Sequence, residues 1–294
     1  MASLKEVKTR INSVKKTLKI TSAMKMVASA KLHRAQVAVG NMLPYQRRLN
    51  RILANFLNAE LSIESPYVDH REVKRVALVA FSSNSSLCGA FNANVIKSLL
   101  QAVAEYRKLG QDNVLIFPIG KKVGDAVKRT GLQAQGAFLS LSDKPTYQEA
   151  DALAQRLMGM YAAGEVDRVE LIYHHFKSVG VQSLVRETYL PIDLEQLVAE
   201  NKNDKPESNR LNDYIIEPSL EYLITRLIPM ALSQKLYTAS VDSNASEHAA
   251  RTLAMQIATD NANDLIQDLT MEYNRSRQQA ITNELLDIVG GSMK

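Results

Sequence analysis

Two long stretches without glycine or proline, one near each end of the chain, most constrain how it can fold. Residues 1–39 and residues 230–289 contain neither residue type, so nothing in them interrupts a helix. At about 1.5 Å per residue, a helix over residues 4–57 would be about 80 Å long, and one over residues 230–289 about 90 Å. A globular domain needs far shorter helices, so the sequence predicts two long helices that pair with each other.

The first stretch has an apolar face of the kind that packs against a second helix, because its apolar and small residues recur at alternating steps of three and four. The positions on this face are Leu4, Val7, Ile11, Val14, Leu18, Thr21, Lys25, Ala28, Leu32, Ala35, Val39 and Met42, then Leu49, Leu53 and Phe56. Thr21 and Lys25 interrupt the face, while Met24 and Met26 point away from it. We expect a small or polar seam there, with adaptable methionine surface turned outward, and a kink or joint at Pro44.

The C-terminal stretch has a thinner face made largely of small residues. Its members are Ala245, Ala249, Ala258, Ala262, Ile266, Leu269, Tyr273 and Ala280. Small residues let two helices approach closely, so the natural partner is the N-terminal helix, in antiparallel orientation. Pro218 and Pro229 mark the expected start and Gly290-Gly291 the expected stop. The weak helix formers of residues 238–246 predict the softest point of this helix.

The middle of the chain alternates between strand and helix patterns. Apolar runs predict strands over residues 73–82, 113–119, 169–176 and 181–189, and helices over residues 93–109, 121–129 and 147–161. Such alternation predicts an α/β layer with some parallel pairing, and Ser178-Val179-Gly180 joins the last two strands as a hairpin. A polar loop over residues 199–212 and an edge strand at 214–216 would precede the last helix.

The predicted fold class is therefore an α/β domain inserted between two long terminal helices that form an antiparallel coiled coil. The predicted domains are an N-terminal coiled-coil helix over residues 1–60, a central Rossmann-like domain over residues 70–215 and a C-terminal coiled-coil helix over residues 216–294.

The distribution of charge separates the N-terminal segment from the rest. Residues 1–57 hold twelve lysines and arginines against Glu6 alone, although the whole chain has a net charge of only +5. The remainder is therefore acidic, and we expect an acidic partner for the N-terminal segment, whether protein, nucleic acid or lipid headgroups. No apolar run approaches the roughly 20 residues needed to span a bilayer.

Patterns that would indicate catalysis, a cofactor or a metal do not form. Gly120-Lys121-Lys122-Val123-Gly124 follows a predicted strand but lacks the glycine spacing of a phosphate-binding loop. His174 and His175 are adjacent in a predicted strand, so they face opposite sides and cannot chelate one metal together. Cys88 is the only cysteine, and we expect it to be a small buried thiol. The serines at 82–86 are expected to cap the helix that follows Cys88. No cofactor is expected.

Three functional classes stay open at this point. Two long amphipathic ends, a compact α/β middle and no active-site pattern favour a mechanical or scaffolding role. A nucleic-acid-binding coiled coil would explain the basic segment, but that segment has no aromatic residue before Tyr45, so stacking platforms are missing. A nucleotide-binding enzyme would explain the middle domain, although the phosphate-binding patterns are missing.

Three runs of sequence resemble one known family. They are RINSVKKTLKITSAMKMVASAKLHRAQ near the start, SLCGAFN in the middle, and SEHAARTLAMQIATDNANDLIQDLTMEYNRSRQQAITNELLDIVGG near the end. Together they resemble the γ subunit of bacterial F-type ATP synthases, in the right order along the chain. The family's central Ser-Asp-basic-Gly is replaced here by Ser83-Asn84-Ser85-Ser86 and its final Gly-Ala by Gly290-Gly291.

The resemblance implies a rotor shaft rather than an enzyme. The coiled coil would sit inside a ring of three α and three β subunits, with the α/β domain near the ε subunit and the membrane c-ring. Proton-driven rotation would change the nucleotide affinity of each β subunit in turn, without catalysis by this chain. The resemblance also implies a peripheral position on the cytoplasmic face of the bacterial inner membrane, and neither a nucleic-acid partner nor a direct small-molecule substrate.

The same resemblance implies two sets of partner contacts. Met24 and Lys25 fall where the family's shaft meets an acidic loop of β, with Arg251 on the opposing helix nearby. Arg277, Gln278, Thr282 and Glu284 fall at the contact with the catch loop of β. An arginine offers a planar donor fork for carboxylates and a glutamine a paired donor and acceptor, so these residue types suit the implied contacts.

Overall fold

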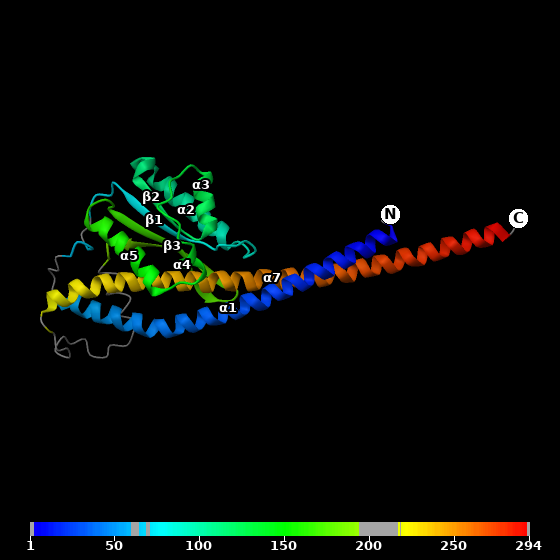
Figure 1. Ribbon diagram of the computed structural model, residues 1–294, viewed down its shortest axis with the longest axis horizontal. Coiled ribbons are helices and arrows are strands. Elements are labelled where there is room, and N and C mark those ends of the chain that lie inside the picture. The colour runs from blue at the N-terminus through cyan, green and yellow to red at the C-terminus, as the bar shows by residue number, and fades with distance from the viewer. Residues whose placement is uncertain (1–2, 60–64, 69–70, 194–216, 218, 293–294) are drawn as a thin grey trace. The chain divides into compact units, whose positions relative to one another are not determined.

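The computed structural model describes residues 3–59, 65–68, 71–193, 217 and 219–292. Two long helices, α1 (Leu4–Ala59) and α7 (Leu220–Ser292), flank a middle segment of strands and shorter helices (Figure 1). The elements between them are β1 (Val76–Phe81), α2 (Phe91–Glu105), β2 (Val114–Ile119), α3 (Lys121–Arg129), α4 (Leu139–Asp143), α5 (Tyr147–Ala162), β3 (Arg168–Ser178) and β4 (Val181–Leu190). The predicted fold class is confirmed.

The chain divides into two compact units. The two-helix unit consists of Met1–Ala30 and Arg251–Lys294, and the sheet unit consists of Lys31–Ala250. Helices α1 and α7 each contribute to both units. The domain limits expected from the sequence stay a prediction.

The sheet unit is built on four strands in the order β2-β1-β3-β4. Strand β1 pairs in parallel with β2 and β3, and β3 pairs antiparallel with β4 as the predicted hairpin. All six residues of β1 are buried, as expected for a central parallel strand that is covered on both faces. The predicted mixture of parallel strands and a final hairpin is therefore confirmed.

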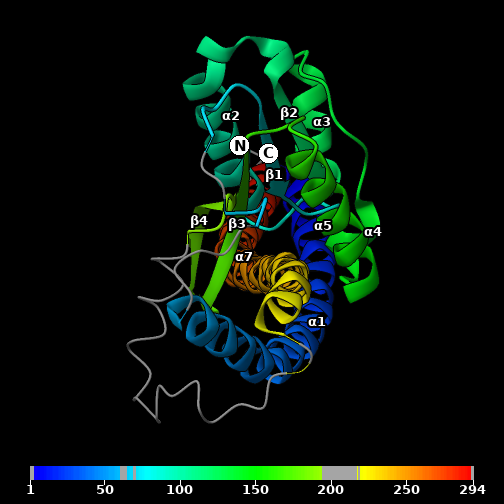
Figure 2. The ribbon, with the colours of Figure 1, turned by 90° about the vertical axis from the view of Figure 1, so that its left-hand side faces the viewer.

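Alternate residues of β1 enter two separate cores. Val76, Leu78 and Ala80 pack with α2 and α3, while Ala77 and Val79 pack with α5 and with parts of α1 and α7. This follows from the two-residue period of a strand, which sends successive side chains to opposite faces. One face of the sheet thus carries α2 and α3, and the other carries α4, α5 and parts of the two long helices (Figure 2).

Within the sheet unit, α1 and α7 run antiparallel and pack through both apolar and polar contacts. Leu53 of α1 is buried in the same core as Leu232 of α7, and the Thr238 hydroxyl donates to the Gln46 amide oxygen at 3.2 Å. Further along, Leu32 and Ala35 of α1 form a small cluster with Ala245 and Ala249 of α7. Small residues on this seam permit the close approach that the sequence predicts.

Residues 238–246, the weakest helix formers of the C-terminal stretch, are helical throughout and largely buried. Their polar groups are used in tertiary contacts: Ser246 Oγ donates to the backbone oxygen of His174 at 3.1 Å, and Asp242 accepts from the Phe176 backbone N–H at 2.8 Å. Packing therefore overrides low helix propensity here. The residues expected to be soft are those that hold α7 to the sheet.

The two-helix unit pairs the start of α1 with the C-terminal part of α7, again antiparallel (Figure 1). The buried members of the predicted faces are Val7, Thr21 and Ala28 on α1, and Ala262 and Leu269 on α7. The predicted seam is confirmed, and Thr21, which interrupts it, is itself buried.

The proline predictions need correction. Helix α1 continues through Pro44 without a break, so this residue is not a joint between two helices. The alternative expectation, a kink at Pro44, stays a prediction. Helix α7 begins at Leu220 and includes Pro229, which therefore does not mark its start. A proline removes one backbone hydrogen bond, and burial of the turns on both sides, as at Met42 and Leu49 of α1, holds the rest of the helix together.

Two other predictions differ from the structure, and one short helix was not predicted. Helix α7 runs through Gly290-Gly291 to Ser292, about two residues past the expected stop. The expected 93–109 helix is α2 followed by a 3₁₀ turn over Tyr106–Leu109. Helix α4 was not predicted. The predicted polar loop at 199–212, the edge strand at 214–216 and Pro218 lie outside the described residues.

Candidate partner-binding surfaces

Met24 and Lys25 of α1 and Arg251 of α7 lie at neighbouring levels of the two-helix unit. The hydroxyl oxygens of Thr21 on α1 and Thr259 on α7 lie 3.0 Å apart and fix the register of the two helices. Lys25 follows Thr21 by four residues, and Arg251 precedes Thr259 by eight. At about 1.5 Å per residue in antiparallel helices, Arg251 and Lys25 lie roughly one helical turn apart along the axis.

These three residues differ in exposure. Arg251 is buried in the seam, with 8 % of its surface exposed, whereas Met24 and Lys25 are half-buried. Met26 is 67 % exposed, so the expected outward methionine surface is confirmed for Met26 and only partly for Met24. A partner approaching α1 here would meet Met24, Lys25 and Met26 before it reached Arg251.

Arg277, Gln278, Thr282 and Glu284 form a second group, on the C-terminal end of α7, and all four are exposed. Arg277 follows Thr259 by 18 residues, and Leu4, where α1 begins, precedes Thr21 by 17. The same register therefore places Arg277 level with the first turn of α1. Beyond it, α7 extends past the described start of α1 as a single helix (Figure 1).

Apolar side chains on this single-helix end are a feature that the sequence reasoning missed. Five large apolar residues there are between 48 % and 68 % exposed: Ile281, Leu285, Leu286, Ile288 and Val289. Two more, Ile20 and Val27, are each 60 % exposed on the outer face of α1. Contiguous exposed apolar side chains mark interaction surfaces. The apolar residues at 285–289 are visible in the sequence. Their exposure depends on the register of α7 against α1, which the sequence does not show.

The start of α3, the one place where a phosphate loop was considered, has its backbone donors already paired. The backbone N–H groups of Lys121, Lys122 and Val123 donate to Asn84 Oδ1, Ser83 O and Ser82 Oγ at 3.0, 3.2 and 3.0 Å. These are the donors that would otherwise bind an anion. This segment is therefore an ordinary strand-to-helix turn.

The same contacts correct the expected role of the serines. Helix α2 begins after Ala90 and has no side-chain cap, so the serines do not cap it. Ser82 caps α3 instead. Gly120, which has a φ of 89°, lets β2 turn into α3 at this point, because a Cβ there would lie 2.1 Å from the backbone oxygen of Ser82.

His174 and His175 face opposite ways, as predicted. His174 is 2 % exposed and stacks on Phe91 with ring centroids 4.4 Å apart, and burial lowers its pKa to about 4. His175 Nδ1 lies 2.5 Å from Oδ2 of Asp242, whose pKa is raised mainly by burial. No group of three or more metal-ligating side chains occurs within the described part of the chain.

Cys88 is buried, with its sulfur accepting from the Asn92 amide at 3.1 Å. The expected buried thiol is confirmed.

Comparison with known proteins decides the family. The family model described as ATP synthase matches residues 3–293. The ATP synthase gamma chain of Bacteroides thetaiotaomicron is 74 % identical over 298 residues and the one of Parabacteroides distasonis 47 % identical over 292, with at least 99 % of each chain covered. The chain belongs to the ATP synthase gamma-chain family. The resemblance seen in the three sequence runs is therefore confirmed over nearly the full length.

Solved structures support the same fold at low sequence identity. A chain of the Euglena gracilis mitochondrial ATP synthase matches with a TM-score of 0.65 at 20 % identity, covering 99 % of this chain and 93 % of that one. A chain of the Tetrahymena thermophila mitochondrial ATP synthase central stalk and c-ring matches with a TM-score of 0.58 at 22 % identity, covering 81 % and 99 %. The fold of two long helices around a small mixed sheet thus also occurs in a chain of each of these two complexes.

The departure from the family pattern at Asn84 has a structural consequence. Its amide oxygen accepts from Lys121 N–H, and its amide nitrogen donates to the backbone oxygen of Leu139 at 2.8 Å. An aspartate could make only the first contact, because a carboxylate is an acceptor. The asparagine therefore ties the loop after β1 to both α3 and α4.

None of the helices in the described ranges is both long and apolar enough to cross a membrane.

Proposed function

We propose that this chain is the central rotor of a bacterial F-type ATP synthase, coupling proton-driven rotation of a membrane c-ring to conformational changes in three catalytic β subunits. Family membership supports the proposal, and the observation that carries it is the single-helix end of α7. This end has five exposed large apolar side chains and no facing helix among the described residues of the two-helix unit. A ring of α and β subunits around the shaft would cover such a surface.

The coupling follows from symmetry. A single chain on the axis of a ring with three α and three β subunits cannot present the same side chains to all three β subunits at once. Each rotary position therefore favours a different conformation in each β subunit, which couples the rotor angle to nucleotide affinity. Rotation driven by protons would release ATP, and ATP hydrolysis would drive the rotor backwards.

The first contact set lies on the outer face of α1. Lys25 supplies a cation for an acidic loop of β, and Met24 supplies adaptable apolar surface for partners that change during rotation. Arg251, buried in the seam about one helical turn away, supports this region from the opposing helix. The excess of basic residues over residues 1–57 favours the approach of acidic loops in general.

The second contact set lies on the end of α7. Arg277 and Gln278 would bind the catch loop of β, Arg277 through its donor fork and Gln278 through its amide. Thr282 donates to the backbone oxygen of Gln278 at 2.9 Å, so it would hold this turn of the helix, and Glu284 adds an acceptor. By the Thr21–Thr259 register, Lys25 is level with residue 255 of α7. The two sets are therefore about 22 residues of α7 apart, about 33 Å of helix, and would contact β at two different heights.

The chain itself would catalyse nothing. The backbone donors at the start of α3 are occupied by the chain's own oxygens, which supports the absence of a nucleotide site in the sheet unit. That unit would sit near the ε subunit and the c-ring. The complex would be peripheral on the cytoplasmic face of the inner membrane through its membrane partners.

Met24→Lys tests the coupling role. The substitution adds a cation beside Lys25 and close to Arg251, and it should disturb the contact with an acidic loop of β more than it disturbs assembly. We expect normal yields of the complex with α and β, but fewer protons pumped per ATP hydrolysed in membrane vesicles. Ala30→Lys, which places the same side chain six residues further along α1 at an exposed position, is the matched control.

Unchanged pumping per ATP in Met24→Lys would contradict the coupling role of that residue. The rotor proposal itself fails if the purified chain forms no stable, ATP-hydrolysing complex with α and β subunits.

A further inference from the structure

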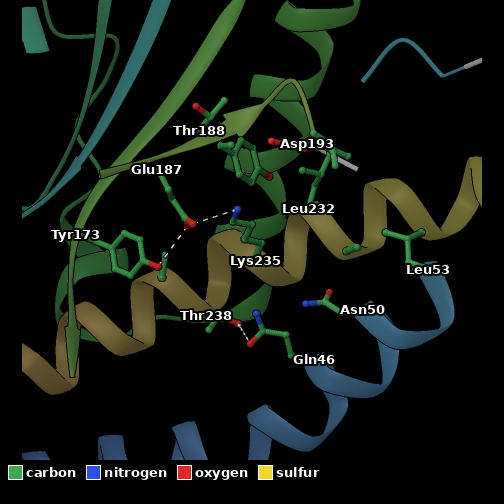
Figure 3. Close-up of a pocket in the computed structure, with 14 residues that line it drawn as sticks. Gln46, Asn50, Leu53, Tyr173, Glu187, Thr188, Asp193, Leu232, Lys235 and Thr238 are labelled. Atoms are coloured by element: carbon green, nitrogen blue, oxygen red, sulfur yellow. Dashed lines mark hydrogen bonds and ion pairs between the residues drawn. The ribbon is translucent and has the colours of Figure 1, made fainter. Parts of the chain in front are cut away.

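The sheet unit contains a cavity of about 270 Å³ that α1, the end of β4 and α7 line together (Figure 3). An apolar cavity of about 150 Å³ is large enough to bind benzene. This cavity therefore has room for a ring with a short polar arm. No role assigned above to the rotor uses this space.

Apolar side chains line part of the cavity. Leu53 of α1 and Leu232 of α7 are buried core residues, and Ala231, Ala239 and Ile192 also line the space. An apolar group that is buried against them contributes about 25 cal/mol for each Å² removed from water. The cavity therefore suits a molecule with a compact apolar body.

The charged groups of the cavity are already compensated. Lys235 Nζ lies 3.3 Å from Glu187 Oε2, and the Tyr173 hydroxyl donates to Glu187 Oε1 at 3.3 Å (Figure 3). Asp193, the other carboxylate among the described lining residues, has an interaction partner of its own. A charged ligand would have to break one of these pairs or stay uncompensated in a partly buried site, and both cost free energy. The cavity therefore suits a neutral molecule.

The hydrogen-bonding groups that remain include several donors. Lys235 has three N–H groups, and its described ion pair with Glu187 uses one of them. The Gln46 amide oxygen accepts from the Thr238 hydroxyl at 3.2 Å, and the Gln46 amide nitrogen has no hydrogen-bond partner among the described residues. Figure 3 shows the Gln46 side chain reaching from α1 toward α7, the helix that carries Lys235. A carbonyl oxygen is a neutral group that accepts from such donors.

Glu187 also keeps spare acceptor capacity. A carboxylate can accept about four hydrogen bonds, and the described contacts of Glu187 are those with Tyr173 and Lys235. An N–H group of a ligand can therefore donate to Glu187 while both partners stay in place. A primary carboxamide combines a carbonyl acceptor with N–H donors and carries no charge. It is thus the simplest functional group that matches the free donors and the free acceptor of this cavity.

We propose that this cavity binds a small primary carboxamide with a compact apolar body. The carbonyl oxygen accepts from Lys235 and Gln46, the N–H group donates to Glu187, and the apolar body lies against Leu53 and Leu232. Because the ligand contacts α1, β4 and α7 together, its binding stabilises the sheet unit by mass action. This inference is independent of the rotor role, so its failure would leave the rotor proposal untouched.

The test uses the full-length chain with labelled isoleucine and leucine methyl groups, titrated with 2-phenylacetamide and followed by NMR. We expect saturable shifts of the Leu53, Leu232 and Ile192 methyl signals. Gln46→Leu removes a donor from a side chain of similar size and should weaken binding about tenfold, which corresponds to about 1.4 kcal/mol. Gln148→Leu, the same change at an exposed glutamine of the sheet unit, should leave binding unchanged.

Two ligands with the same ring test the charge argument without any change to the chain. Phenylacetate carries an anion in place of the amide and 2-phenylethylammonium a cation, and each should bind at least about tenfold more weakly than the amide. Ala231→Leu places a larger apolar side chain at the cavity wall and should abolish the shifts. The proposal is overturned if the amide does not bind, if either ion binds as tightly, or if Ala231→Leu or Gln46→Leu binds the amide as tightly as the native chain.

Discussion

The buried His174 makes the stability of the chain depend on pH in a direction that can be tested. Burial lowers its pKa from 6.5 to about 4, so below pH 6.5 the unfolded chain takes up a proton that the folded chain does not. The contribution of neutral His174 to the free energy of unfolding is therefore complete above about pH 6.5, and it is lost as the pH falls towards 4. A shift of this size corresponds to about 3 kcal/mol of unfolding free energy.

The assay is urea unfolding of the full-length chain between pH 4 and pH 8, compared with His174→Phe. Phenylalanine cannot be protonated and keeps a ring against Phe91, whose ring lies 4.4 Å away in the native protein. The unfolding free energy of the native chain minus that of the variant should fall by about 3 kcal/mol from pH 7 to pH 4. Taking this difference cancels the effects of other titrating groups on the unfolding free energy. One of them is Asp242, whose raised pKa makes the folded chain more stable as the pH falls. A difference that stays flat over this range would refute the reasoning.

Two further substitutions test the packing of the long helices and the capping of α3. Ala249→Leu should destabilise the chain by about 1–3 kcal/mol in urea unfolding, because it overfills a seam where Ala249 is fully buried. The same change at the exposed Ala30 should have little effect, and equal effects at the two positions would contradict the seam. Ser82→Ala should cost about 1 kcal/mol, because the Val123 N–H loses its acceptor at the first turn of α3. An unchanged unfolding midpoint in Ser82→Ala would show that this hydrogen bond contributes nothing.

Helices and strands with strong periodicity could be predicted from the sequence. Helix α3 has the predicted bounds, residues 121–129, and the hairpin turns at Ser178-Val179-Gly180 as expected. Helix α4 could not be predicted, since it has only five residues and is held by tertiary contacts. These include Asn244 Nδ2 donating to Ser142 O at 2.8 Å and the Lys31–Asp143 ion pair at 3.2 Å.

The polar residues show a second limit of local reasoning. A serine beside a helix start was expected to cap that helix, but Ser82 caps α3, which begins almost 40 residues later, because β1 and β2 are neighbours in the sheet. In the same way, residues 238–246 are weak helix formers that are largely buried within α7. In both cases the deciding contact joins residues far apart in sequence.

The candidate partner surfaces depend on the register of the two long helices. The sequence gives the residue types of Lys25 and Arg277, but not which of them face another helix of the same chain. The Thr21–Thr259 contact supplies that information and places Arg277 at the start of the single-helix end. The exposure of the apolar residues there follows from this register and not from any local pattern.

Rotation of a single complex tests the central claim most directly. A complex of this chain with three α and three β subunits would be fixed to a surface through β, with a bead attached to the sheet unit at an introduced cysteine. During ATP hydrolysis we expect the bead to turn in one direction in three equal steps per revolution, one for each β subunit. ATP hydrolysis at the normal rate without rotation of the bead would contradict the rotor proposal.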